Sequence, residues 1–216
     1  MHASSDPRLL RTLDALEISF AIFDSQHQAL YPKCLDLLTN PKNVAFAFDV
    51  AWSIVDTVHR IREVAQAVPG LNTKRLEVRR FLTATALAET LRHYIQHLRN
   101  ELLKQPENPY PVWGSLAWAD ATEPMMTHTV LSGASRKGLW HPSGTYDLAK
   151  GGWGSRVTLT VGTHAFEFDP IAVAVHQFAD FIVPWIRMNY GPEMPEYSTP
   201  NISSVQFLGM TRVEPQ

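Results

Sequence analysis

Apolar residues recur at helical spacing through most of the first hundred residues of the chain. The first stretch follows Asp6 and Pro7, a favourable N-cap and first-turn pair. A second stretch is interrupted by Pro32, and a third is ended by Pro69 and Gly70. The pattern therefore predicts four helices, with bounds near 7–23, 29–38, 43–68 and 72–105.

The pattern changes after residue 110, where strand-like pieces at 112–119 and 125–131 precede an exposed loop over 132–153. Residues 156–161 and 164–168 then alternate on both sides of a Gly-Thr turn, which predicts a β-hairpin. Asp169 and Pro170 next cap a helix with apolar residues on one side and a late kink at Pro184.

The last helix needs an apolar surface to cover, and the bundle of the first half offers one. We therefore expect a mainly α (α+β) fold in a single domain over 1–216: a helical bundle with an inserted small antiparallel β ribbon. The bundle comprises 6–105 and 169–190, the ribbon 110–168, and an extended tail 191–216, with one late strand at 203–208.

Composition narrows the class of protein. The 216 residues carry a net charge of −2, without the positive field typical of dedicated duplex-DNA binders. No apolar run approaches the length of a membrane span, and the first residues lack a signal-peptide pattern, so we expect a cytoplasmic protein with no membrane partner. The only cysteine, Cys34, lies in an apolar-patterned run and is interpreted as a small buried side chain.

One segment is locally cationic and also carries the strongest chemical candidates. Around the predicted helix, Leu91, Ile95, Leu98 and Leu102 define a buried side. The opposite arc holds six polar residues: Glu89, Arg92, His93, Gln96, His97 and Asn100. Between 72 and 104, seven basic residues (Lys74, Arg75, Arg79, Arg80, Arg92, Arg99, Lys104) stand against three acidic ones (Glu77, Glu89, Glu101).

These residue types suit the cleavage of RNA through its own 2′-hydroxyl. That reaction needs a group that moves protons near neutral pH, a task for histidine, and a fixed cation for the phosphorane charge, a task for arginine. His97 is the candidate for proton transfer, and Arg92 is the candidate for the fixed cation. His93 and Asn100 would orient these two side chains. No phosphate loop, Gly-x-Ser-x-Gly elbow or dinucleotide fingerprint is present, and we expect no cofactor.

Arg92, His93 and His97, with four residues between the arginine and the second histidine, resemble the motif of the HEPN proteins, which are helical bundles. The resemblance implies a metal-independent endoribonuclease in which Arg92 and His97 of two protomers meet across a homodimer interface, with His93 as the supporting polar residue. It also implies a toxin or antiphage role, with an antitoxin as a possible partner and single-stranded RNA as the substrate.

Other interpretations of the same residues stay open. His93 and His97 are four apart, the spacing with which two imidazoles bind one metal from a helix, and Asp56 and His59 can add ligands from the preceding helix. This pattern favours a metal-dependent hydrolase. Alternatively, the polar arc is a solvated face, and Asp56 and His59 are a helix-surface pair, with His59 beside Arg60 and Arg62 in solvent.

A different class of function is a non-catalytic HEPN-like binding module. The Gly- and Pro-rich middle of the chain is rich in aromatic residues, which serve on loops as stacking or protein-contact anchors. They are Tyr110, Trp113, Trp118, Trp140, Tyr146 and Trp153, and Arg136, Lys137 and His141 lie among them. The same tryptophans are also typical of residues that cover the core of a small sheet.

Overall fold

The computed structural model describes residues 6–103, 111–123, 125–132, 141, 143, 144, 146, 147, 149 and 151–191, and for 146, 147 and 153 the backbone alone. The fold is mainly α with a small antiparallel sheet, as predicted. The helices are α1 (Pro7–Asp36), α2 (Val44–Ala67), α3 (Leu76–Ala84), α4 (Ala86–Gln96), α5 (Leu98–Leu103) and α6 (Phe168–Tyr190), with a 3-10 turn, η1 (Pro41–Asn43). Apart from Gly191, the predicted tail lies outside the described residues.

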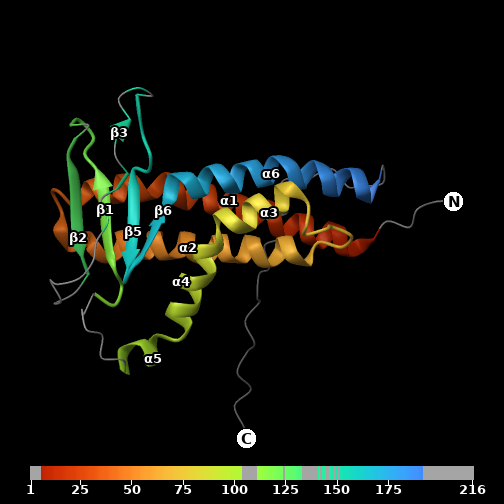
Figure 1. Ribbon diagram of the computed structural model, residues 1–216, viewed down its shortest axis with the longest axis horizontal. Helices are drawn as coiled ribbons and strands as arrows, with labels where there is room; N and C mark the ends of the chain where they lie inside the picture. The colour runs from red at the N-terminus through yellow and green to blue at the C-terminus, as the bar shows by residue number, and fades with distance from the viewer. Residues whose placement is uncertain are drawn as a thin grey trace, which may run out of the picture.

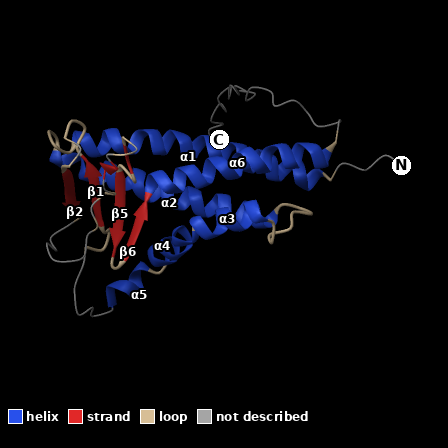
Figure 2. Ribbon diagram, turned by 45° about the horizontal axis from the view of Figure 1, so that its top comes forward, coloured by secondary structure: helices blue, strands red, loops and turns tan. Residues whose placement is uncertain are grey.

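Three long helices form the body of the molecule. Figures 1 and 2 show α1, α2 and α6 running lengthwise side by side, with the sheet at one end and α3 and α4 leading obliquely away from α6. A single cluster of buried apolar side chains includes residues of these helices and of the sheet. The strands thus share their core with the bundle, as an insertion between α5 and α6.

The sheet follows the alternating patterns of the sequence. Its strands are β1 (Ser115–Ala119), β2 (Thr127–Leu131), β5 (Val157–Val161) and β6 (His164–Glu167), ordered β2-β1-β5-β6 and antiparallel throughout. The central strands β1 and β5 are buried along their whole length, including Thr158 and Thr160, whose side chains the alternation alone places in water. Two short strands, β3 (Tyr146–Asp147) and β4 (Gly152–Trp153), pair within the segment predicted as a loop.

The first two predicted helices are one helix in the structure. The prediction of an interruption at Pro32 was wrong, because α1 continues past this residue to Asp36. A proline inside a helix removes one backbone hydrogen bond. Here Leu30 and Cys34 on either side are buried in the core, and that packing outweighs the lost bond.

The helix predicted over 72–105 is divided into three. The first break falls at Thr85, whose hydroxyl is buried and donates to the carbonyl of Phe81 at 2.7 Å. The guanidinium of Arg62 on α2, itself only 6% exposed, donates to the Leu82 carbonyl and to the Thr85 hydroxyl, the latter at 2.8 Å. Arg62 thereby donates hydrogen bonds to acceptors that the break leaves without helical partners. The interpretation of Arg62 as a surface residue was therefore wrong.

Helix α6 closes the bundle. Of the helices described, it is the one long and apolar enough to cross a membrane by length and composition. Its buried residues pack against α1 and α3. Three pairs of polar side chains join α6 to α1: Arg187 to Glu17 at 2.8 Å, His176 to Asp24 at 2.7 Å, and Asp169 to His27 at 3.1 Å.

Asp169 does not cap α6 as predicted, because the N-cap is Glu167. Its carboxylate instead accepts from the backbone N–H of Arg156 at 2.6 Å and contacts the Arg156 guanidinium and His27. Burial raises the pKa of Asp169, but the hydrogen bonds from His27 and Arg156 outweigh it and hold this pKa well below its usual value of 3.8. The charged form is therefore the one that the folded state favours.

We expect Asp169→Asn to lower the free energy of unfolding at pH 7 by about 1–2 kcal/mol, because bonds to a charged acceptor are replaced by weaker ones. Since folding lowers the pKa of Asp169, its contribution is complete above 3.8 and is lost as the pH falls through the folded-state value. Urea unfolding of both proteins from pH 7 downward measures this, and the gap between them should shrink below 3.8. A gap that is independent of pH would contradict this account.

Candidate functional site

Asp56 on α2 forms ion pairs with two arginines, Arg60 on the same helix and Arg92 on α4. Its carboxylate lies 2.5 Å from Nη2 of Arg60, one turn later on α2, and 2.9 Å from Nε of Arg92 on α4. The Arg92 contact is an ion pair without hydrogen-bond geometry, since both atoms are buried and lack an aligned partner. Two guanidinium charges therefore stand against one carboxylate, and about a third of the Arg92 side chain stays exposed.

These residues line a cleft of about 360 Å³ between α1, α2 and α4. Asp56 and its two arginines form one part of the cleft wall. The wall continues along α2 with Asp49, Trp52 and Ser53. Asp49 is exposed and has no ion pair or hydrogen bond among the described residues. An anion in the cleft would therefore meet the guanidiniums of Arg60 and Arg92, whose charge Asp56 neutralises in part. The Asp49 carboxylate, which has no described partner, lies beside them.

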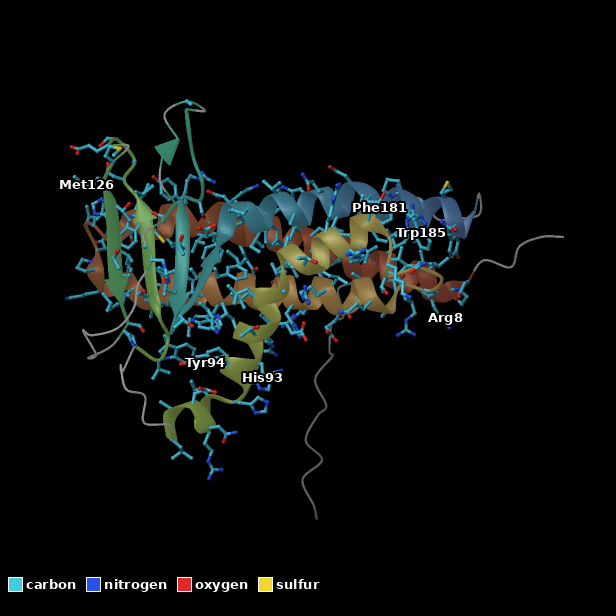
Figure 3. All side chains as sticks on the ribbon, viewed as in Figure 1. Arg8, His93, Tyr94, Met126, Phe181 and Trp185 are labelled. Atoms are coloured by element: carbon cyan, nitrogen blue, oxygen red, sulfur yellow. The ribbon has the colours of Figure 1, made fainter. Side chains whose placement is uncertain are left out.

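The two predicted histidines are brought together on the surface beside this cleft. The rings of His93 and His97 have centroids 4.3 Å apart and are tilted by 51°. Both side chains are exposed, and neither lines the cleft. In Figure 3, His93 leaves α4 on a different side from Tyr94, whose hydroxyl donates to the Val112 carbonyl at 2.8 Å.

The helix ends at the second histidine. His97 is the C-cap of α4, with φ −106° and ψ 25°, so the prediction that it lies inside a long helix was wrong. Asn100 lies on α5 beyond this break, and its backbone N–H donates to the His97 carbonyl at 2.8 Å. Its exposed amide makes no hydrogen bond to Arg92 or to either histidine within the part of the chain described.

The four candidate metal ligands do not form one cluster. Asp56 is engaged by Arg60 and Arg92, while His59 has a buried Nδ1 without a hydrogen-bond partner. Across the described ranges, no three histidine, cysteine or carboxylate side chains are grouped in a way that could hold a metal ion. Cys34 is fully buried, which raises the pKa of its thiol to about 12 and leaves no thiolate for nucleophilic chemistry near neutral pH.

One residue of the cleft wall, Trp52, contacts two further aromatic side chains. Trp52 stacks on Tyr94 with centroids 6.4 Å apart and meets Trp113 edge-on at 6.3 Å. Its indole N–H donates to the Trp113 carbonyl at 3.2 Å. The sequence pattern indicated Trp113 as an anchor but not Trp52, because Trp52 falls within the apolar stripe of α2.

The other members of the predicted aromatic loop have separate environments. Trp118 is buried in β1 beside His128, with centroids 5.6 Å apart, and is part of the core. His141 is exposed, and its backbone N–H donates to the Thr160 hydroxyl at 3.1 Å. The remaining members lie outside the described residues or have no described side chain: Tyr110, Arg136, Lys137, Trp140, Tyr146 and Trp153.

A larger cleft, of about 750 Å³, lies between α3 and α6. Arg79 and Arg80 line it, and neither forms an ion pair with another described residue. This cleft accounts for part of the cationic segment seen in the sequence, and it contains none of the predicted catalytic side chains.

Comparison with models of protein families, with curated proteins and with solved structures finds no match for this chain.

Proposed function

We propose that this chain is a HEPN-like, metal-independent endoribonuclease that acts as a homodimer on single-stranded RNA in the cytoplasm. The observation that carries the proposal is the position of Arg92. Its guanidinium shares the Asp56 carboxylate with Arg60 in a cleft, while His93 and His97 lie together on the adjacent surface. A phosphate-binding cation and two proton-transfer groups thus lie within two turns of one helix.

The reaction that suits these groups is an internal transesterification of RNA. The 2′-oxygen forms a bond to phosphorus while the bond to the 5′-oxygen breaks, which leaves a 2′,3′-cyclic phosphate and a 5′-hydroxyl. One imidazole accepts the proton of the 2′-hydroxyl and a protonated imidazole donates one to the leaving oxygen. Arg92 stabilises the negative charge that develops on the phosphorane oxygens.

Dimerisation would complete the site. About a third of the Arg92 side chain stays exposed beside its contact with Asp56, and both imidazoles are exposed on the adjacent surface, so a second copy docked there can present its histidines to this arginine. Leu102 and Leu103 on α5 are 59% and 74% exposed and offer apolar surface near His97 for such a contact. A toxin or antiphage role, with an antitoxin that covers this surface, is consistent with the proposal.

The test is cleavage of an end-labelled single-stranded RNA in excess EDTA, beside the same RNA with a 2′-deoxy nucleotide at the preferred position. We expect cutting to survive chelation, to stop at the deoxy position, and to yield 2′,3′-cyclic phosphate ends. The last two results follow because the nucleophile is the 2′-hydroxyl, and the first follows because arginine, not a metal ion, stabilises the charge.

Each contrary result supports a different function. Activity that EDTA abolishes and a divalent metal restores would favour the metal-dependent hydrolase built on His93 and His97. Cleavage of the deoxy substrate would show an external nucleophile. No cleavage of any RNA would leave a non-catalytic binding module, for which the exposed Trp113 is the best anchor.

A further inference from the structure

A second pocket, of about 400 Å³, adjoins the Arg92 cleft on the side of the sheet. The two hollows have Asp49 and Trp52 in common, so these residues form the ridge between them. The remaining wall is mainly apolar and comes from the start of α2 and from the segments flanking β1 and β2. It includes Val44, Phe48, Trp113 and Ser132.

Contacts with neighbouring residues position the aromatic wall of this pocket. Trp52 is fixed between Tyr94 and Trp113, and its N–H is used by the Trp113 carbonyl. Gly114, next to Trp113, has φ +83°, and a Cβ at this position would collide with the carbonyl oxygen of Thr160. The backbone thus requires glycine here, and Trp113 keeps an indole that is 47% exposed at the pocket.

The polar groups of the pocket are hydrogen-bond acceptors. The Asp49 carboxylate is exposed and has no partner in the described ranges. The Ser132 hydroxyl already donates to the Gly114 carbonyl at 2.9 Å, which leaves its oxygen to accept. Mainly apolar walls combined with hydrogen-bond acceptors favour a planar ligand that carries N–H donors along its own edge.

We propose that this pocket binds a guanine base of the RNA, adjacent to the phosphate that Arg92 contacts. Guanine presents two neighbouring N–H donors, on N1 and on the exocyclic N2, that match the two oxygens of Asp49. Adenine and cytosine offer only an amino group on this edge, and uracil only N3–H. The stacking surface is Trp113, a residue type on which any base can stack.

The inference deepens the proposed ribonuclease function and rests on it for the identity of the ligand as RNA. Continuity of the two hollows is the structural link, because one nucleotide can place its phosphate beside Arg92 and its base beyond Asp49. An acceptor-only pocket with an aromatic wall also suits an organic cation such as a basic side chain. Competition with an organic cation separates these ligands.

The probe is a set of 2′-O-methyl RNA hexamers, which cannot be cleaved, with guanine, inosine, adenine or uracil at one position in an otherwise uracil sequence. Binding to the full chain is measured by the fluorescence anisotropy of an end label. We expect the guanine hexamer to bind about tenfold or more tightly than those with adenine or uracil. Inosine, which lacks the N2 amino group, should bind with intermediate affinity.

Two variants assign the preference to the pocket. Asp49→Asn should abolish the discrimination between guanine and inosine, and Trp113→Ala should weaken binding of every hexamer by about fivefold or more. Asp14→Asn is the matched control, because Asp14 is an exposed carboxylate on α1 with no ion pair among the described residues. Thermal unfolding of each variant confirms that the comparison is made between folded proteins.

The outcomes distinguish this inference from the proposed activity. RNA cleavage by the wild type with equal affinity for all four hexamers would overturn the guanine pocket and leave the nuclease. Selective guanine binding without cleavage would keep the pocket and remove the nuclease. The inference is also overturned if no hexamer binds, or if tetramethylammonium competes with the guanine hexamer as effectively as guanosine monophosphate does.

Discussion

Replacing His97 with alanine is expected to slow the cleavage of single-stranded RNA by about 10²–10⁴-fold, the contribution typical of a group that transfers a proton in the transition state. Arg92→Ala should give a loss of similar size, because the phosphorane charge loses its fixed cation. Arg92→Lys should recover little, since an ammonium cannot reproduce the planar fork of a guanidinium. Single-turnover rates with enzyme in excess measure the chemical step directly.

The control for charge is Arg11→Ala, which removes an exposed arginine from the part of α1 near its N-terminal end. This variant should cleave RNA like the wild type.

Mixing Arg92→Ala with His97→Ala protein tests where the site is assembled. If the arginine and the histidine come from different protomers, mixed dimers contain one intact site and part of the activity returns. Mixtures that stay as inactive as their components would place both groups in one chain.

The second large effect concerns stability. Arg62→Leu should lower the free energy of unfolding by about 2–4 kcal/mol, because two acceptors in the helix break, the Leu82 carbonyl and the Thr85 hydroxyl, lose their donor. Urea denaturation followed by circular dichroism measures the change. A shift of the midpoint at constant slope would locate the effect in folded-state contacts.

Glu89→Gln is the matched comparison for this variant. Glu89 pairs with Arg62 at 2.8 Å, but its side chain is 64% exposed, so the loss of its charge should cost less than about 1 kcal/mol. Buried charged groups can sometimes be replaced by apolar residues without loss of stability. Equal stability of Arg62→Leu and the wild type would mean that leucine packing compensates and that the break at Thr85 does not depend on the arginine.

The sequence predicted the elements whose causes are local. The apolar spacing of α2 and α6, the Asp6 cap of α1 and the turn of the β5–β6 hairpin all lie within their own segments. The break at Thr85 was not foreseen, because its cause is Arg62, which is 23 residues earlier in the chain. One signal was present: Arg62 stands four residues after Val58 and three before Ala65, on the apolar side of its helix.

The candidate site was predicted in part. Helical spacing put Arg92, His93 and His97 near one another, and the structure has the two rings in contact. Spacing could not show that Arg92 turns inward to Asp56, because this depends on how α4 packs against α2. Asp49 and Trp52 were not identified either, since Trp52 falls within the apolar stripe of α2 and no motif of the sequence includes Asp49. Their significance comes from the hollow that they share with residues far away in the sequence.

The placement of α6 has a consequence for how the chain is made. The polar pairs between α1 and α6 join residues as far as 170 positions apart, and the sheet lies between the two helices in the sequence. Contacts of such long range form slowly, because a large loop must close before they contribute. During synthesis, the apolar surface that α6 covers on α1 therefore stays exposed until α6 has been made. Exposed apolar surface makes partly folded chains prone to aggregation, so we expect the nascent chain to need protection over that interval.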